Sequence, residues 1–201
     1  MKVVPLAESY GSVEILNSKF QAYLFPFSGE GCFAELYQKA KSLSPKADHY
    51  PYSYIFGEVI KSFDDGEPGG AAGRPILSLL QSRGIDRAMV VVARYFGGSK
   101  LGLPRLRKAF LSAAENAIGN GKYGEVVELT KAELDLSYHD FEEARKFLSR
   151  RHGKLEVSDF GEKVRAILLS DDKIIDDLSE TLSKESSLTK IGLVETIKEL
   201  D

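Results

Sequence analysis

Basic residues are concentrated between Arg94 and Lys108, a stretch that contains no acidic residue. It is expected to form the end of a buried strand, a loop with Gly97 and Gly98, and a helix that begins at Pro104. Because a helix N-terminus carries a partial positive charge and unpaired N–H groups, cations placed there favour the binding of an anion. The residues expected to contact it are Arg94, Lys100, Arg105, Arg107 and Lys108. The alternative is that these side chains are solvated and point apart.

A second loop, residues 64–74 (DDGEPGGAAGR), combines acidic residues with glycines. Asp64, Asp65 and Glu67 could hold a divalent metal ion through their carboxylate oxygens. Alternatively, the aspartates accept backbone N–H groups in a tight turn that leads into a helix. We favour the turn, and we expect no metal and no cofactor. Arg74 and Arg94 could pair with these acids, which would join both glycine loops into one surface. That surface would contain Asp64, Asp65, Gly66, Glu67, Arg74, Arg94, Gly97 and Gly98, with Arg74 as a further anion ligand.

No motif for catalysis is recognisable in the sequence. It lacks both a P-loop and the GxSxG pattern of a nucleophile elbow. The histidines, His49, His139 and His152, are not spaced as metal ligands, and Cys32 falls in an apolar helical pattern that is typical of a core thiol. The sequence therefore predicts a protein that is not an enzyme.

The composition is typical of a globular protein. The 201 residues, 43% hydrophobic and 28% charged, suffice for one large domain or two small ones. A single cysteine excludes an intramolecular disulfide, and no apolar run approaches the roughly 18 residues of a membrane span. The first residues are too broken by polar residues and a proline for a secretory signal, so we expect a cytoplasmic protein that does not bind membranes.

The net charge of −3 is unevenly distributed along the chain. Residues 1–125 hold 15 basic and 12 acidic side chains, which gives +3, whereas residues 126–201 hold 12 and 18, which gives −6. Binding of a polyanion is therefore expected to be confined to the first part of the chain.

Hydrophobic periodicity predicts a mixture of strands and helices up to residue 119. Strands are expected at 13–27, 50–56, 59–63 and 89–93, and helices at 33–43, from Pro75 to a cap at Gly84, and from Pro104 to Gly119. Ser28 is expected to cap the first helix, and Pro51 to place the strand 50–56 at a sheet edge or to start it. The aromatic face of that strand could stack nucleic-acid bases, but its alternation favours packing under a helix.

Residues 119–124 (GNGKYG) form a turn-rich break and the expected domain boundary. The domains are expected at 1–121 and 125–201. Beyond the break, the expected elements are a strand 129–137, a helix 141–151, hairpin strands 155–160 and 164–170, a helix 174–182 and a strand 187–196. This β-α-β-β-α-β order is that of a ferredoxin-like domain.

Two long blocks, residues 62–77 and 90–110, closely resemble the signature of the YigZ/IMPACT family. Residues 158–169 resemble the central hairpin of the C-terminal domain of its bacterial members. The resemblance implies an α+β protein with two parts. The first would be an α/β sandwich like the second domain of a small-subunit ribosomal protein, and the second a ferredoxin-like domain like one of elongation factor G. The resemblance carries over no catalytic residues.

The chain departs from the family pattern at two places. His49 matches a family histidine that is commonly followed two positions later by cysteine, but Pro51 stands there and removes any thiol role. Pro104 and Arg105 stand where many members have two glycines. The added cation favours contact of a phosphate with side chains rather than with bare backbone at the helix start.

Both structural relatives that the resemblance implies act on RNA in the ribosome, which is an analogy at the level of fold. Eukaryotic members of the family are linked to translational control. We therefore expect a non-enzymatic factor that binds RNA or a ribosome-associated partner and modulates translation. One alternative is a metal-assisted enzyme acting on a small phosphorylated or nucleotide ligand. Another is a protein-interaction module.

Overall fold

The computed structural model describes residues 2–200, and the chain divides into two compact units. The first unit ends at Glu125 and also takes in the end of the chain from Lys198, while the second is Val126–Ile197. Each unit combines a sheet with helices, so the α+β class expected from the sequence is confirmed.

The sheet of the first unit has the strand order β2-β3-β6-β4-β5, and its neighbouring strands are antiparallel. Its strands are β2 (Ser9–Ile15), β3 (Ser18–Pro26), β6 (Ala88–Tyr95), β4 (Tyr52–Phe56) and β5 (Val59–Phe63). A short strand, β1 (Val3–Pro5), pairs instead with the first residues of β7.

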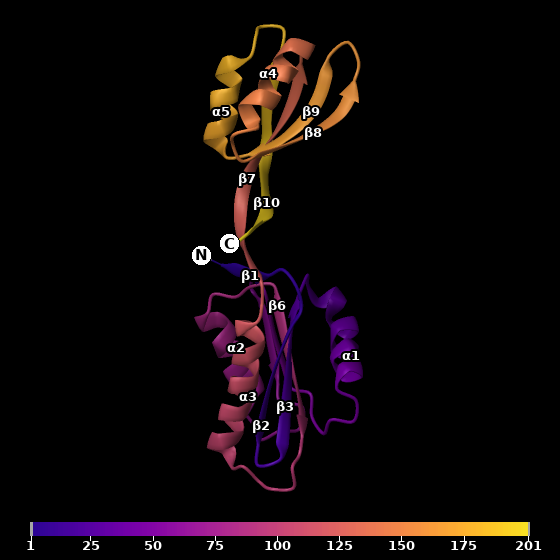
Figure 1. The fold of residues 1–201 in the computed structure, drawn as a ribbon, viewed down its shortest axis with the longest axis vertical. Helices are drawn as coiled ribbons and strands as arrows, with labels where there is room; N and C mark the ends of the chain where they lie inside the picture. The colour runs from indigo at the N-terminus through magenta and orange to yellow at the C-terminus, as the bar shows by residue number, and fades with distance from the viewer. Residues whose placement is uncertain (1, 201) are drawn as a thin grey trace. The chain divides into compact units, whose positions relative to one another are not determined.

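Helices cover both faces of this sheet (Figure 1). A single turn of 3-10 helix (Glu30–Cys32) leads into α1 (Phe33–Leu43), which lies on one face. The other face carries α2 (Gly73–Ser82) and α3 (Leu103–Gly119). Strand β6 is consequently buried on both sides, as its continuous apolar sequence predicts.

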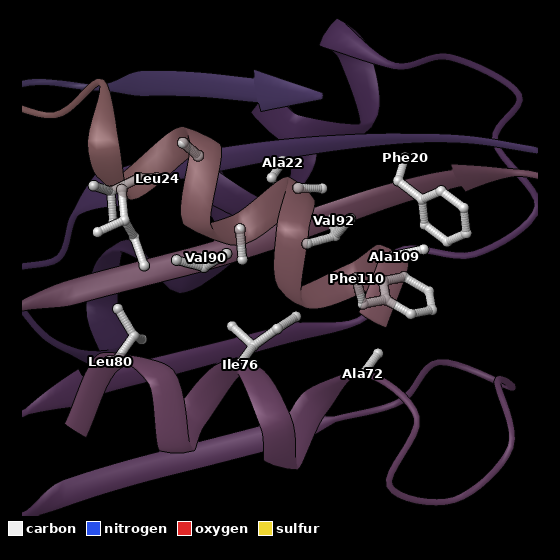
Figure 2. Close-up of a cluster of buried hydrophobic side chains, with 14 of the residues drawn as sticks. Phe20, Ala22, Leu24, Ala72, Ile76, Leu80, Val90, Val92, Ala109 and Phe110 are labelled. Carbon is white, nitrogen blue, oxygen red and sulfur yellow. The ribbon is translucent and has the colours of Figure 1, made fainter. Parts of the chain in front are cut away.

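Alternate residues of the central strands build two separate cores. Val90 and Val92 of β6 pack with Ile76 of α2 and Phe110 of α3, and Figure 2 shows these side chains converging between the helices and the strands. The core on the opposite face contains the aromatic side chains of β4, with Tyr52 and Tyr54 against Phe33 and Tyr37 of α1. The aromatic face of β4 therefore packs under a helix, as its alternation predicts.

Two local expectations in this unit are wrong, and of the two alternatives for Pro51 the strand start holds. The segment 13–27 is not one strand, because Leu16 and Asn17 turn the chain at φ of 47° and 64° and create the hairpin of β2 and β3. Strand β4 is not at the sheet edge, because it pairs with both β5 and β6, and Pro51 lies just before it. Ser28 does not cap α1, since the 3-10 turn intervenes and Cys32 holds the cap position.

The second unit has the element order β-α-β-β-α-β and the sheet order β10-β7-β9-β8, which is a ferredoxin-like arrangement. Its elements are β7 (Tyr123–Leu136), α4 (Tyr138–Leu148), β8 (Gly153–Phe160), β9 (Val164–Ser170), α5 (Asp172–Thr181) and β10 (Ser187–Glu199). Leu134 and Leu168 of the sheet pack in one cluster with Phe141 of α4 and Ile175 of α5, so both helices cover the same face.

Across the part of the chain that the structure describes, no helix has the length and apolar character needed to cross a membrane.

Candidate functional site

The acidic glycine loop, residues 64–74, is organised by the carboxylate of Asp64. This group accepts hydrogen bonds from the backbone N–H groups of Gly70, Ala72 and Gly73, at 2.8, 3.0 and 2.8 Å. These N–H groups lie at and just before the start of α2, so Asp64 caps that helix from outside it. Burial would raise the pKa of Asp64, but the three hydrogen bonds and the nearby charge of Arg74 outweigh it and hold the pKa below its ordinary value.

Glu67 and Arg94 form a buried ion pair between this loop and β6. The Nη1 atom of Arg94 lies 2.7 Å from both carboxylate oxygens of Glu67, and the two side chains are 8% and 1% exposed. The guanidinium carbon lies 5.5 Å from the ring centre of Phe20 and 5.6 Å from that of Phe96. The charge of Arg94 is thus already balanced, which differs from the free phosphate ligand expected from the sequence.

His49 and Asp65 fix the middle of the same loop. Nδ1 of His49 lies 2.7 Å from the carbonyl oxygen of Asp65, and the Asp65 carboxylate accepts the N–H of Tyr50 at 2.7 Å. Gly66 takes a φ of 82° directly against the His49 ring, where a side chain would be strained. His49 therefore supports the loop that carries Glu67.

The three carboxylates of the loop face different partners. Asp64 binds the start of α2, Asp65 binds Tyr50 and Glu67 binds Arg94. No group of three or more potential metal ligands occurs among residues 2–200. The arrangement is that of a hydrogen-bonded turn, which is the interpretation that the sequence favours.

The second glycine loop, between β6 and α3, is anchored to the hairpin of β2 and β3. The N–H of Gly97 donates to Oγ of Ser18 at 3.0 Å, and a Cβ at Gly97 would lie 2.1 Å from the backbone of Asn17. The N–H of Phe96 donates to the Asp48 carboxylate at 2.7 Å. These two hydrogen bonds hold the start of the loop, and Gly98 follows at a φ of 85°.

Two hollows flank the acidic loop. The arginine hollow, of about 700 Å³, is lined by Asp64, Gly69, Gly70, Arg74, Pro75, Ser78 and Arg107. The loop pocket, of about 360 Å³, is lined by residues of both glycine loops and the start of α3: Glu67, Pro68, Arg94, Phe96, Lys100, Leu101, Gly102, Leu103 and Leu106.

The structure distributes the predicted cations over these features. Arg74 and Arg107 line the arginine hollow, where Nε of Arg107 donates to the carbonyl of Gly70 at 3.3 Å. Lys100 lines the loop pocket, together with the paired Arg94. Arg105 and Lys108 are exposed on α3 and line neither hollow. Within residues 2–200, the side chains of Arg74, Lys100, Arg105 and Lys108 make no ion pair or hydrogen bond.

Phe96 lines the loop pocket; it falls in the block that resembles the family signature, but it was not predicted to be a site residue. It is 48% exposed although it follows a buried strand, and it lies over the guanidinium of Arg94. The signal that could have found it is a large aromatic residue directly before two glycines, where no periodic element requires it for the core. The pairing of Arg94 with an acid of the first loop confirms one of the pairings expected from the sequence, and the structure identifies that acid as Glu67.

Comparison with known proteins identifies a matching family model, similar sequences and a similar solved structure. The family model described as "Impact N-terminal domain" matches residues 16–118. An "IMPACT family member" of Haemophilus influenzae is 29% identical over 190 residues, which cover 92% of each chain. Another from Thermus thermophilus is 32% identical and covers 77% of this chain and 84% of its own. A solved structure titled "Crystal structure of an hypothetical protein" has a TM-score of 0.65 and 26% identity, covering 95% of this chain and 97% of that one.

Proposed function

This chain belongs to the IMPACT family, and from that premise we propose that it is a non-enzymatic factor that binds RNA and acts in translation. The link to translation rests on the family resemblance set out above. The link to RNA rests on the surface around the starts of α2 and α3, which carries basic side chains and two hollows.

One observation carries the proposal: within residues 2–200 these basic side chains form no ion pair, although Arg74 lies near the charge of Asp64. Arg74, Lys100, Arg105 and Lys108 form no ion pair among the described residues, and Arg107 bonds to a carbonyl oxygen. Unpaired cations near two helix N-termini raise the electrostatic potential of this surface, which a polyanion lowers on binding. Since the whole chain carries a net charge of −3, such binding is local and not a general attraction.

The test is equilibrium binding of a fluorescent single-stranded RNA to the full chain over a range of salt concentrations. In the variant K100E/K108E, two exposed side chains change sign, and we expect weaker binding and a salt slope reduced by about 1.4, which is ~0.7 for each lost phosphate contact. The matched control is K173E/K184E, with the same charge change at exposed positions of the second unit. Unchanged binding by a folded K100E/K108E variant at low salt would contradict the proposal.

A second candidate function, action on a small phosphorylated or nucleotide ligand, is favoured by one observation. The two glycine loops converge to line a single pocket of a size suited to a small molecule. This candidate predicts a thermal shift with mononucleotides that depends on a divalent cation. RNA binding predicts a shift with oligonucleotides that does not depend on that cation.

A further inference from the structure

The loop pocket combines features that a phosphate-binding surface does not need. Its volume of about 360 Å³ lies in the range of small-molecule sites. Much of its lining is apolar, from Pro68, Leu101, Leu103 and Leu106, although it opens beside the basic stretch. Leu103 is 43% exposed at the first position of α3. An apolar wall next to cations fits a ligand that is itself part charged and part apolar.

Arg94, one of the residues that line this pocket, has a buried polar atom without a hydrogen-bond partner. Nε of Arg94 is inaccessible to solvent and hydrogen-bonds to no atom of the described chain, while Nη1 of the same group is fully engaged with Glu67. Buried donors are almost always satisfied in folded proteins, because leaving one unpaired costs its full desolvation. Because Nε is closed to solvent, a ligand in the pocket meets the exposed groups of the lining and not this atom.

The ion pair of Glu67 and Arg94 determines which kind of ligand group the pocket can take. Glu67 also lines the pocket, and its carboxylate cancels the charge of Arg94. A phosphate placed against this pair would meet a carboxylate as well as a guanidinium, whereas a neutral carbonyl or ring nitrogen would meet no such opposition. Charged groups of the ligand would instead lie beside Lys100 at the rim.

Phe96 supplies the flat surface that such a neutral ring would need. Its side chain lines the pocket, is 48% exposed and has a backbone N–H held by Asp48. Aromatic side chains on a cationic surface stack unpaired bases without regard to their sequence. The guanidinium of Arg94 lies 5.6 Å from the centre of this ring and adds a cation–π contact that fixes it.

We propose that the loop pocket receives one unpaired nucleobase of a bound RNA, stacked on Phe96. The inference rests on the proposed function and makes it more specific, since it requires single-stranded rather than fully paired RNA. The basic side chains outside the pocket hold the phosphates, and the pocket holds the base.

The test compares the full chain with its F96A variant on two fluorescent probes of equal length and charge. One probe is a single-stranded oligoribonucleotide, and the other has the same sugar–phosphate backbone without bases. We expect F96A to bind the first probe about tenfold more weakly and the second as tightly as the unchanged protein. The matched control is F160A, which removes an exposed phenylalanine, 63% accessible, from the second unit and should change neither affinity.

Three outcomes separate this inference from the function on which it rests. If F96A and the unchanged protein bind the natural oligonucleotide equally well, the base pocket is overturned. The proposed function still stands in that case, provided that the binding depends on salt. Equal losses on both probes also overturn the base pocket, because the effect would not come from a base. If the unchanged protein binds neither probe at low salt, both proposals fail.

A second measurement does not depend on a substitution at Phe96. In ¹⁵N-labelled protein, the backbone amide signal of Phe96 should move when the natural oligonucleotide is added and stay in place with the probe that lacks bases. An unmoved signal at saturating oligonucleotide contradicts stacking on Phe96.

Discussion

Arg94 belongs to the candidate site, as the sequence predicts, but its role differs from the one that its charge suggests. Its position after a buried strand and before a glycine loop indicated an anion ligand, yet its guanidinium is 8% exposed and pairs with Glu67. The pair joins the two glycine loops, because Glu67 lies on the first and Arg94 precedes the second. Arg94 therefore positions the site, whereas Arg74, Lys100, Arg105 and Lys108 are exposed and form no ion pair within residues 2–200.

This role predicts an asymmetric response to substitution. Replacing Glu67 by glutamine leaves the Arg94 charge buried without a counter-charge, so we expect E67Q to lower the free energy of unfolding by about 3 kcal/mol. Replacing both partners by apolar residues in E67L/R94L removes the uncompensated charge and should cost less than E67Q alone. Urea unfolding followed at the amide signals of β6 measures both variants. A double variant less stable than E67Q would show that the ion pair does not govern the stability of the loops.

At the scale of elements, hydrophobic periodicity predicted helices and strands best where one face of the element is buried. The helices α1, α2 and α3 and strand β9 were located from their apolar spacing, because burial of one face imposes that spacing directly. The hairpin of β2 and β3 was missed, since its turn uses Leu16 and Asn17 in left-handed conformations without a glycine. Leucine in such a position carries no signal that sequence reasoning could use.

The parts of the candidate site were predictable, and its assembly was predictable only in outline. The sequence indicated that Arg74 or Arg94 could pair with the acidic loop, and the pair of Arg94 with Glu67 confirms one such pairing. The two glycine loops and the basic stretch stand out in the sequence as separate motifs. That Glu67 reaches Arg94 and that both loops line one pocket depends on β6 lying beside β4 and β3 in the sheet. The strand order of a sheet is set by long-range packing, which the spacing of residues along the chain does not encode.

In the second unit, Asp140 joins α4 to the segment between α5 and β10. Its buried carboxylate accepts hydrogen bonds from the hydroxyl groups of Ser183 and Ser186 at 2.6 and 2.5 Å. These bonds, with a further contribution from Ser137, lower the pKa of Asp140 from 3.8 to about 2. Because the folded state lowers this pKa, the stabilisation is fully present above pH 3.8 and is lost as the pH falls towards 2.

We therefore expect D140N to lower the free energy of unfolding at pH 7 by about 2 kcal/mol and to weaken the loss of stability between pH 4 and pH 2. Asparagine cannot accept these hydrogen bonds with a negative charge at any pH. Urea unfolding at several pH values, followed at the amide signals of α4, measures the effect. The control D177N changes an exposed aspartate of α5 and should keep the acid dependence of the unchanged protein. The same dependence in D140N would contradict the assignment.

At the scale of the whole molecule, charge and packing divide the chain in the same place. The first 125 residues carry +3 and the remainder −6, and the structure splits into compact units at Glu125. The buried clusters respect this division, because the clusters around β6 contain no residue of the second unit and the cluster around Leu168 contains none of the first. The first unit, which carries the surface proposed to bind RNA, thus has hydrophobic cores of its own.

Separate cores predict separate stabilities. Leu168 is fully buried in the second unit, so L168A should destabilise that unit by about 2–5 kcal/mol through the lost contacts and the cavity left behind. Hydrogen exchange should then rise in peptides from 126–197 and stay unchanged in β3, β6 and α3, and RNA affinity should also stay unchanged. The reciprocal variant I76A, at a fully buried position of α2, should raise exchange in the first unit alone. Exchange that rises throughout the chain in either variant would mean that the units unfold together, because their stabilities would then be coupled.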